Sequence, residues 1–381
     1  MAVSTKSIRY KLRADRTMPS SGDLAEPGID PDQIPLLDGG FPVAAYQYPQ
    51  LRFMGSKFRL LPWIHRTVSE LRFETVLDAF SGSGCVSYLF KAMGKQVSSN
   101  DFLNLSATVA RALVENDKTR LSENDLETLL EYDPRHKRFI EQTFSGIFYT
   151  PEDLRFLDRA SWNVRKFRSP HKQALALAAL IRSCAKRQPR GVFTVAGDPE
   201  RYKDDRRDLK LSIREHFIEQ VAAYNRAVLA NGYSNSARCG DIFTWNSGSP
   251  DLVYMDPPYV PRADDNCYIK RYHFLEGLSC YWEGMNLLPE SRVRKLEKRF
   301  TPFSYRRTAL EAFDHIFRKF ADSTLVLSYS SNGYPDLDEI SRTMRRYKPH
   351  VDVVSCQHRY HFGTHAAAKR TAALEYLIIG T

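Results

Sequence analysis

The amino-acid sequence predicts an α/β protein with parallel strands in its sheet. An apolar run at 75–78 precedes a glycine-containing turn at 80–84, and the helical pattern that follows ends at Gly94. A second strand is expected at 96–100. Because a strand, a helix and a strand in this order form a β-α-β unit, the two strands must run parallel with a right-handed crossover.

Further helices and strands extend this unit along the chain of 381 residues. A helix is expected at about 57–71, and the pattern from about 105 to 230 is mostly helical. A buried strand is expected at 252–255, and a helix at about 308–320 leads into a strand at 325–329. A chain of this length can bury a full core as one elaborated domain or as two.

The two ends of the chain differ in character. Residues 1–48 mix Pro, Gly, Asp and Ser with little periodicity, so we expect an N-terminal arm that is partly flexible. Near the C-terminus, the apolar segments 351–355 and 374–379 could pair as an antiparallel hairpin. Such a hairpin would make the sheet mixed.

The composition is that of a soluble protein with an anionic partner. The 55 Lys and Arg residues exceed the 45 Asp and Glu residues, and the formal net charge of +10 favours nucleic acid or a membrane surface. No apolar run approaches the roughly 20 residues of a membrane span, and the polar N-terminus lacks a signal-like apolar region. The six cysteines show no metal-ligand spacing, so we expect a cytoplasmic protein with neither disulfides nor a bound metal.

The excess positive charge is concentrated in one block of the sequence. Residues 155–214 contain 16 Lys and Arg against 6 Asp and Glu, which leaves the rest of the chain about neutral. Such a block is typical of a surface that contacts phosphates. Smaller basic clusters occur at 292–299 and 306–307. The candidate DNA-binding residues of the large block are Lys186, Arg187 and Arg190.

A rigid loop directly follows the apolar run that ends at Met255. Its sequence is Asp256-Pro257-Pro258-Tyr259, and the two prolines have no N–H to donate. An exocyclic amino group on a base is a poor nucleophile because its lone pair is delocalised into the ring. The Asp256 carboxylate and the Pro257 carbonyl could accept its two N–H groups and favour attack on a methyl donor, while Tyr259 could stack on the base. This motif alone does not separate adenine N6 from cytosine N4.

Three groups at predicted strand ends could bind a cofactor, since ligands of open α/β sheets bind beyond the carboxyl ends of the strands. Asp101 could accept hydrogen bonds from ribose hydroxyls, and Asp241 could accept one from an adenine amino group. The turn matches neither a dinucleotide nor a P-loop fingerprint, so a nucleoside without phosphates fits better, of which S-adenosylmethionine is the common one. A plain connection between a strand and a helix would also explain the turn. The candidate residues of the turn are Phe80, Ser81, Gly82 and Gly84.

Three segments together resemble a known family. The segments 52–57, 78–84 and 256–259 occur in the order seen in the D12 class, or alpha group, of adenine-N6 DNA methyltransferases, to which the DNA adenine methylases belong. The similarity covers roughly 50–110 and 235–381. The block between them matches that family only in its position, where the family carries its target-recognition domain.

The resemblance implies roles for individual residues. Asp101 would bind the ribose of S-adenosylmethionine and Asp241 its adenine, and Asn100 could share the role of Asp101. The methionine end would be held by the glycine turn together with Phe53, Gly55, Lys57 and Asp78.

The base-binding pocket needs a second wall opposite Tyr259. Tyr272, His273 and Phe274 lie downstream and could form it, although packing of a helix explains each of them equally well. A base inside a duplex would have to be flipped out to reach such a pocket, which costs a few kcal/mol.

These observations predict an adenine-N6 DNA methyltransferase that uses S-adenosylmethionine and flips its target base. The expected fold is Rossmann-like, with a mixed sheet, a C-terminal β-hairpin and a mainly helical target-recognition insert. The catalytic domain is expected at 49–111 and 235–381, and the insert at 112–234.

Three alternatives remain open from the sequence: an RNA adenine-N6 methyltransferase, a cytosine-N4 DNA methyltransferase, and a catalytically silent DNA-binding protein. The expected partner is double-stranded DNA, with a cognate restriction endonuclease as a candidate and no membrane. We expect a monomer or dimer encoded by a bacterium or a phage.

Overall fold

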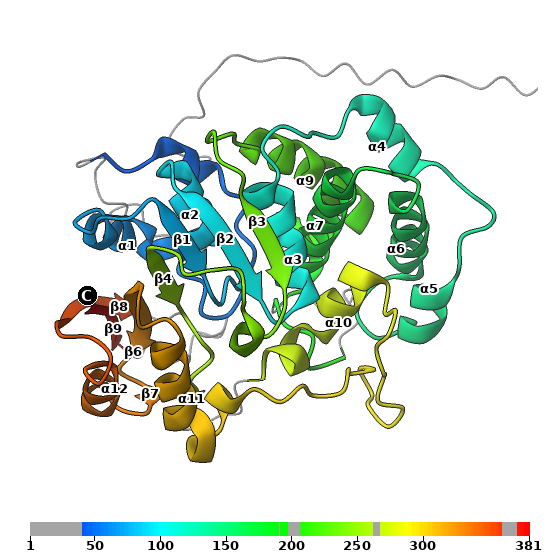
Figure 1. Ribbon diagram of the computed structural model, residues 1–381. Helices are drawn as coiled ribbons and strands as arrows, with labels where there is room; N and C mark the ends of the chain where they lie inside the picture. The colour runs from blue at the N-terminus through cyan, green and yellow to red at the C-terminus, as the bar shows by residue number, and fades with distance from the viewer. Residues whose placement is uncertain (1–39, 190, 197–205, 262–266, 360–371) are drawn as a thin grey trace, which may run out of the picture. The chain divides into compact units, whose positions relative to one another are not determined.

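A seven-stranded sheet with the order β3-β2-β1-β4-β6-β9-β8 organises the residues that the computed structural model describes (Figure 1). The described residues are 40–189, 191–196, 206–261, 267–359 and 372–381. The strands of this sheet are β1 (Thr75–Asp78), β2 (Gln96–Asp101), β3 (Ser236–Cys239), β4 (Leu252–Met255), β6 (Thr324–Ser330), β8 (Val351–Arg359) and β9 (Ala372–Gly380).

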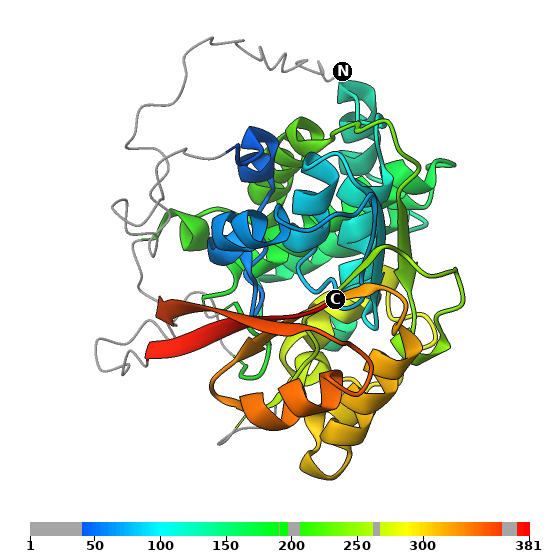
Figure 2. The ribbon, with the colours of Figure 1, turned by 60° about the vertical axis from the view of Figure 1, so that its left-hand side comes forward.

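The sheet is mixed, as the sequence predicts. Strands β3, β2, β1, β4 and β6 run parallel to one another, whereas β9 runs antiparallel to both β6 and β8. The predicted C-terminal hairpin is therefore confirmed, and Figure 2 shows β8 and β9 side by side along most of their length. A small second sheet pairs β5 (Val260–Pro261) with β7 (Gly333–Tyr334) and so anchors the chain just after Tyr259.

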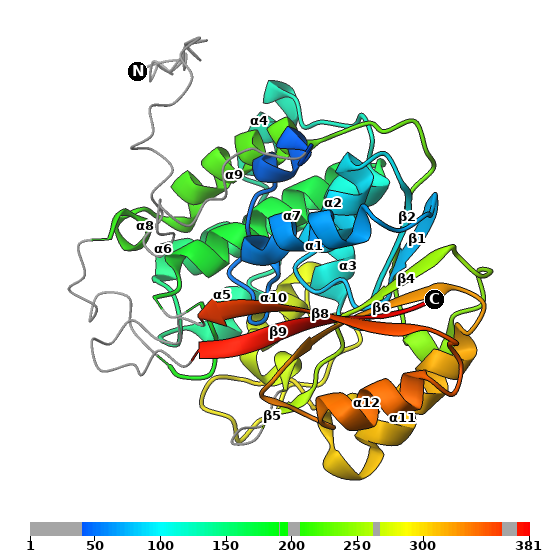
Figure 3. The ribbon, with the colours of Figure 1, turned by 90° about the vertical axis from the view of Figure 1, so that its left-hand side faces the viewer.

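Helices cover both faces of the sheet. Figure 3 shows α1, α2 and α7 on one face and α11 and α12 on the other. The longer helices are α1 (Leu61–Val68), α2 (Cys85–Ala92), α4 (Glu123–Leu130), α6 (Pro151–Val164), α7 (Pro170–Arg187), α9 (Ile213–Ala227), α10 (Tyr268–Cys280), α11 (Arg306–Lys319) and α12 (Leu337–Met344). Shorter helices are α3 (Asn104–Ala110), α5 (Phe139–Phe144) and α8 (Arg207–Lys210), with single turns at η2 (Val43–Gln47), η3 (Phe58–Leu60), η4 (Arg111–Glu115), η6 (Ile242–Thr244) and η7 (Pro302–Ser304).

Successive residues of the central strands β1, β4 and β6 pack into two separate hydrophobic cores, because side chains alternate between the faces of a sheet. In β4, Leu252 and Tyr254 join the core under α1, α2 and α7. Val253 and Met255 join the core under α11 and α12. This two-sided burial explains why β4 reads as an uninterrupted apolar run in the sequence.

The order of the strands reverses at β1, and this creates a crevice at one edge of the sheet. The chain passes from β1 outward to β2 and β3, then crosses back to pair β4 with the other side of β1. Ligands of open α/β sheets bind at such a switch point, outside the carboxyl ends of the strands. Asp78 ends β1 and Asp256 follows β4, so both carboxylates lie at this crevice.

A buried glutamate fixes the backbone that follows β2. Glu276 of α10 accepts hydrogen bonds from the backbone N–H groups of Asn104 and Leu105 at 3.0 Å, and from the side chain of Asn104 at 3.0 Å. The first N–H groups of a helix have no partner within the helix, and a carboxylate satisfies them well. Glu276 thereby holds the start of α3, and with it the loop that carries Asp101.

We expect the substitution Glu276→Gln to destabilise the protein. A buried backbone N–H that loses a charged acceptor costs about 1–3 kcal/mol, so the free energy of unfolding measured in urea should fall by that amount. Glu290→Gln, at an exposed glutamate, is the matched control and should stay within about 0.5 kcal/mol of the parent. Equal unfolding midpoints for the two variants would contradict the role of Glu276.

Candidate active site

The glycine turn after β1 is held in a conformation that requires glycine. Gly84 has a φ of 80°, and a Cβ atom there would lie 2.8 Å from the Tyr48 hydroxyl oxygen. That hydroxyl donates a hydrogen bond to the Ser83 carbonyl. Gly82 has a φ of 50° and packs against the Phe53 ring. The turn therefore presents bare backbone to the crevice, where a ligand can approach closely.

Asp101 is tied to the glycine turn rather than left free in the crevice. Its carboxylate accepts hydrogen bonds from the backbone N–H groups of Gly82 at 2.7 Å and Leu103 at 2.8 Å. A carboxylate has about four acceptor positions, so it can still bind ribose hydroxyls. Burial raises the pKa of Asp101 to about 6. The side-chain amide of Asn100 donates hydrogen bonds to the carbonyls of Ala79 and Gly240. These bonds connect the carboxyl ends of β1, β2 and β3.

Asp78 is a second buried carboxyl group at this edge. Its side chain accepts a hydrogen bond from the Ser87 hydroxyl at 2.6 Å. Burial raises the pKa of Asp78 to about 7, and the nearby Asp256 and Asp101 add to this rise. The group therefore changes charge near neutral pH.

Aromatic side chains form part of the pocket wall beside Asp241. Phe243 and Phe303 stack on each other with ring centroids 5.6 Å apart, and Phe80 contacts Phe303 edge-on at 5.2 Å. Asp241 lines the same pocket as these rings, and one of its carboxylate oxygens accepts a hydrogen bond from the Phe243 N–H at 3.0 Å. This part of the wall is apolar and carries one carboxylate.

The carboxylate of Asp256 forms an ion pair with Lys57 in the interior. The Lys57 ammonium donates to both oxygens of Asp256 at 2.8 Å and to the Gly55 carbonyl at 3.1 Å, which uses its three N–H groups. Burial alone would lower the pKa of Lys57, but the Asp256 carboxylate raises it above its ordinary value. Burial raises the pKa of Asp256, and the Lys57 cation opposes that rise.

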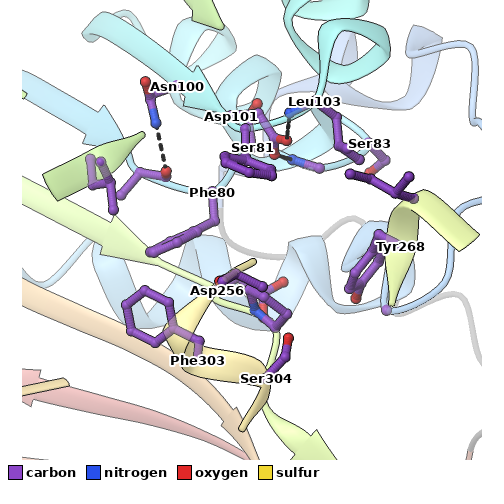
Figure 4. A pocket seen from close by; sticks show the side chains of 18 of the residues that line it. Phe80, Ser81, Ser83, Asn100, Asp101, Leu103, Asp256, Tyr268, Phe303 and Ser304 are labelled. Carbon is purple, nitrogen blue, oxygen red and sulfur yellow. Dashed lines mark hydrogen bonds between the residues drawn. The ribbon is translucent and has the colours of Figure 1, made fainter. Parts of the chain in front are cut away.

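One pocket joins these groups. Figure 4 shows Phe80, Asp101, Asp256 and Tyr268 around the same hollow. Most of the predicted site residues line it, namely Phe53, Gly55, Lys57, Asp78, Phe80, Ser81, Gly82, Asp101, Asp241, Asp256 and Pro258. Pro257, Tyr259 and Gly84 are not among the lining residues. Tyr259 is nevertheless close enough to Lys57 and Asp256 for their charges to affect its pKa.

None of the three residues predicted for the second wall of the base pocket lines the pocket, but the nearby Tyr268 does. His273 and Phe274 are fully buried in the core, and His273 bonds to the Phe193 carbonyl at 2.7 Å. Tyr272 is also buried and stacks on Phe53, and its hydroxyl oxygen accepts a hydrogen bond from the Met54 N–H at 2.7 Å. Tyr268 lines the pocket instead. One helical turn separates Tyr268 from Tyr272, which the weak periodicity of this segment does not resolve.

The predicted DNA-binding residues do not form an exposed surface. Lys186 pairs with Asp208 at 3.1 Å, Arg187 pairs with Asp153 at 3.4 Å, and their side chains are only 12% and 11% exposed. Both charges are therefore neutralised inside the protein, and this argues against their proposed contact with phosphates. Arg190 lies outside the described residues.

Sequence reasoning missed three aromatic residues of the pocket. Phe243 lies two positions after Asp241, and this proximity is a local signal that could have indicated it. Phe303 and Tyr268 lie in the segments after the Asp-Pro-Pro-Tyr loop and carry no motif of their own. Only the fold brings them to the crevice.

The fold and the site together define a Rossmann-like methyltransferase. A model of the family described as D12 class N6 adenine-specific DNA methyltransferase matches residues 53–326. The chain therefore belongs to this family, whose members methylate the N6 atom of adenine in DNA. Membership of this family favours adenine N6 over cytosine N4 as the methylated atom, and DNA over RNA as the substrate. S-adenosylmethionine is the general methyl donor of such enzymes.

Characterised relatives agree with this family. The chain is 28% identical over 327 residues to the type II methyltransferase M2.HphI of Haemophilus parahaemolyticus, covering 82% of this chain and 93% of that protein. It is 22% identical to the type II methyltransferase M.NlaIII of Neisseria lactamica, covering 81% of this chain and 92% of that protein. The modification methylase LlaI of Lactococcus lactis subsp. lactis is also 22% identical, and the match covers 78% of this chain and 49% of LlaI.

The described part of the chain contains no helix with both the length and the apolar character that a membrane span requires. Among the same residues, no group of three or more His, Cys, Asp or Glu side chains is arranged to hold a metal ion.

Replacing the cation of the buried ion pair should impair methyl transfer. In Lys57→Met, burial would raise the pKa of Asp256 further, so a higher pH is needed to ionise this carboxyl group. We expect the rate at pH 7 to fall by about 10²-fold and the acidic limb of the pH–rate profile to move to higher pH. Lys95→Met, which removes a lysine paired with Glu74 at 3.1 Å, is the control. An unmoved acidic limb would refute this role of Lys57.

Proposed function

We propose that the pocket binds S-adenosylmethionine and a flipped adenine side by side, and that Asp256 is the catalytic acceptor of the adenine amino group. The observation that carries this proposal is the partly buried Asp256 side chain, which Lys57 orients through two hydrogen bonds in the same pocket as the glycine turn. Two separate sites would not allow transfer between the two molecules.

The residues of the pocket fit a nucleoside cofactor that carries positive charge. The glycine turn would receive the methionine portion, Asp101 the ribose hydroxyls, and Asp241 with the apolar wall of Phe243 and Phe303 the adenine. Asp78 would face the cationic groups. When bound, S-adenosylmethionine supplies an electrophilic methyl group on a positively charged sulfur.

Asp256 and the carbonyl of Pro257 would activate the target base. Each would accept one N–H of the adenine amino group, which draws the nitrogen lone pair out of conjugation with the ring. The positive charge that develops on N6 is then stabilised by a preorganised carboxylate. The proton released from N6 can pass to Asp256, because a carboxyl group with a raised pKa accepts a proton more readily than an exposed one.

Lys57 acts through Asp256 in this scheme and differs from the role that the family resemblance implies. Its three N–H groups are used by Asp256 and Gly55, so it is better suited to orient the carboxylate than to bind the methionine end of the cofactor. The remaining acceptor positions of Asp256 stay available to the adenine.

We also propose duplex DNA as the substrate and a partner restriction endonuclease with the same recognition sequence, since relatives are named as type II methyltransferases and modification methylases. In this proposal residues 49–111 and 235–381 form the catalytic part, and 112–234 take part in target recognition. Plasmid DNA from cells that express the protein should then resist cleavage by that endonuclease.

The substitution Asp256→Asn tests the catalytic assignment. It keeps the shape of the side chain but removes its charge, so transfer of labelled methyl to duplex DNA should fall by about 10²–10³-fold. Asp352→Asn, at an exposed position of β8, should leave the rate unchanged. Digestion of the product to nucleosides should give N6-methyladenine. A rate for Asp256→Asn near that of the parent would exclude Asp256 as the acceptor.

Cofactor binding should strengthen as the pH rises from about 6 to 8. The pKa of Asp78 is about 7, and only its ionised form attracts a cation, so the affinity for S-adenosylmethionine should increase by up to about tenfold over this range. Asp101, with a pKa of about 6, steepens the lower end of the curve. Isothermal titration of parent and Asp78→Asn measures the effect, and the variant should show a flatter profile. The same pH dependence in both proteins would rule out Asp78 as its source.

A further inference from the structure

The rim of the pocket contains a strongly basic segment. Residues 291–307, here called the rim segment, contain seven Lys and Arg against one Glu. Residues 298–305 line the same pocket as Asp256. The rim segment thus brings an excess of six positive charges, out of the net +10 of the chain, to the entrance of the active site.

Two aromatic rings at the rim are exposed and stacked on each other. Phe300 is 64% exposed and Tyr305 is 47% exposed, and their centroids are 5.3 Å apart with planes 19° from parallel. Of the large apolar side chains that are exposed in the described part of the chain, only these two line the pocket. Exposed aromatic pairs beside a site are typical of surfaces that bind a partner.

The rim segment is anchored between these two rings. Phe303 is buried and contacts Phe80, Phe243 and Phe313. Arg299 lies over the Phe102 ring at 5.5 Å and donates a hydrogen bond to the Phe102 carbonyl at 3.3 Å. These contacts hold the rim segment in place, while Phe300 and Tyr305 remain exposed and can contact a partner.

We propose that the rim segment contacts duplex DNA around the target adenine. Its cations would bind backbone phosphates on either side of the target, and the Phe300–Tyr305 pair would stack on the bases that border the gap left by the flipped adenine. This inference rests on the proposed flipping of adenine into the pocket. Aromatic side chains stack on bases of any sequence, and apolar side chains of DNA-bending proteins enter base steps in this way.

The cations of this segment suit phosphates better than Lys186 and Arg187 do. Arg292, Arg299, Arg306 and Arg307 are all exposed, whereas the side chains of Lys186 and Arg187 are only 12% and 11% exposed and are held in ion pairs. Only exposed cations can release the counterions of DNA, which is the source of salt-dependent affinity.

The double substitution Phe300→Ala, Tyr305→Ala tests the stacking role. Long-read sequencing of DNA from cells that express the parent first identifies the methylated sequence, and a duplex with this site is the probe. Loss of stacking should weaken binding of this duplex by about 5- to 100-fold. In a duplex with 2-aminopurine beside the target, the fluorescence rise on binding should shrink. The variant Phe300→Tyr, which keeps both rings, should behave as the parent.

Tyr46→Ala is the matched control, because Tyr46 is also 41% exposed and lies in η2, outside both the lining of the pocket and the proposed recognition insert. It should bind the duplex as the parent does. Titration with S-adenosylmethionine should give the same affinity for the parent and the double variant within twofold, which also shows that the variant is folded. Loss of cofactor affinity together with DNA affinity would make the segment a cofactor cover and overturn the inference.

The salt dependence of DNA binding tests the cations. Arg299→Ala and Arg307→Ala should each reduce the slope of log affinity against log salt concentration by about 0.9. The control Arg72→Ala, at an exposed arginine before the amino end of β1, should not. If the parent methylates no adenine in any DNA, the proposed function fails. If the parent methylates adenine and the rim variants bind and methylate as well as it does, this inference alone fails.

Discussion

A buried ion pair between Lys57 and Asp256 joins two parts of the chain that are 199 positions apart. Transferring two charges out of water costs several kcal/mol for each ion, and the pair repays this only with good geometry and further hydrogen bonds. Here the ammonium contacts both carboxylate oxygens and the Gly55 carbonyl. The pair fixes the loop after β4 against the segment before α1, and the Lys57 cation opposes the rise in the pKa of Asp256 that burial causes.

The same edge of the sheet collects more negative charge than one lysine can balance. Asp78 and Asp101 are buried near Asp256, and the pKa of each is raised, first by burial and then by neighbouring carboxylates. Such a cluster is stabilised by any cation that enters it. A sulfonium cofactor with an ammonium group meets this need, so the electrostatics of the pocket favour a cationic methyl donor over an uncharged nucleoside.

Features that depend on short segments could be predicted from the sequence. Contacts between segments that are far apart in the sequence could not. The glycine turn, the Asp-Pro-Pro-Tyr loop and the C-terminal hairpin each carry a local pattern, and the structure has all three. The contact between Lys57 and Asp256 and the place of Phe303 depend on how strands pair, which no local pattern contains. The charge count of 155–214 did not identify which of its cations are exposed, for a different reason. Counting cannot tell an exposed arginine from one paired with a buried aspartate, as Arg187 is with Asp153.

The opposite signs of the pocket and its rim restrict how DNA can approach. Carboxylates at the bottom of the pocket repel phosphates, while the exposed arginines of the rim segment attract them. In the proposed complex the backbone of the DNA would be held at the entrance, and an uncharged base would move inward to Asp256. An adenine that leaves the duplex also leaves a gap, and the exposed rings that line the pocket in the described part of the chain are Phe300 and Tyr305. This separation of charge would favour entry of a single base, because the phosphates would hold the rest of the DNA outside.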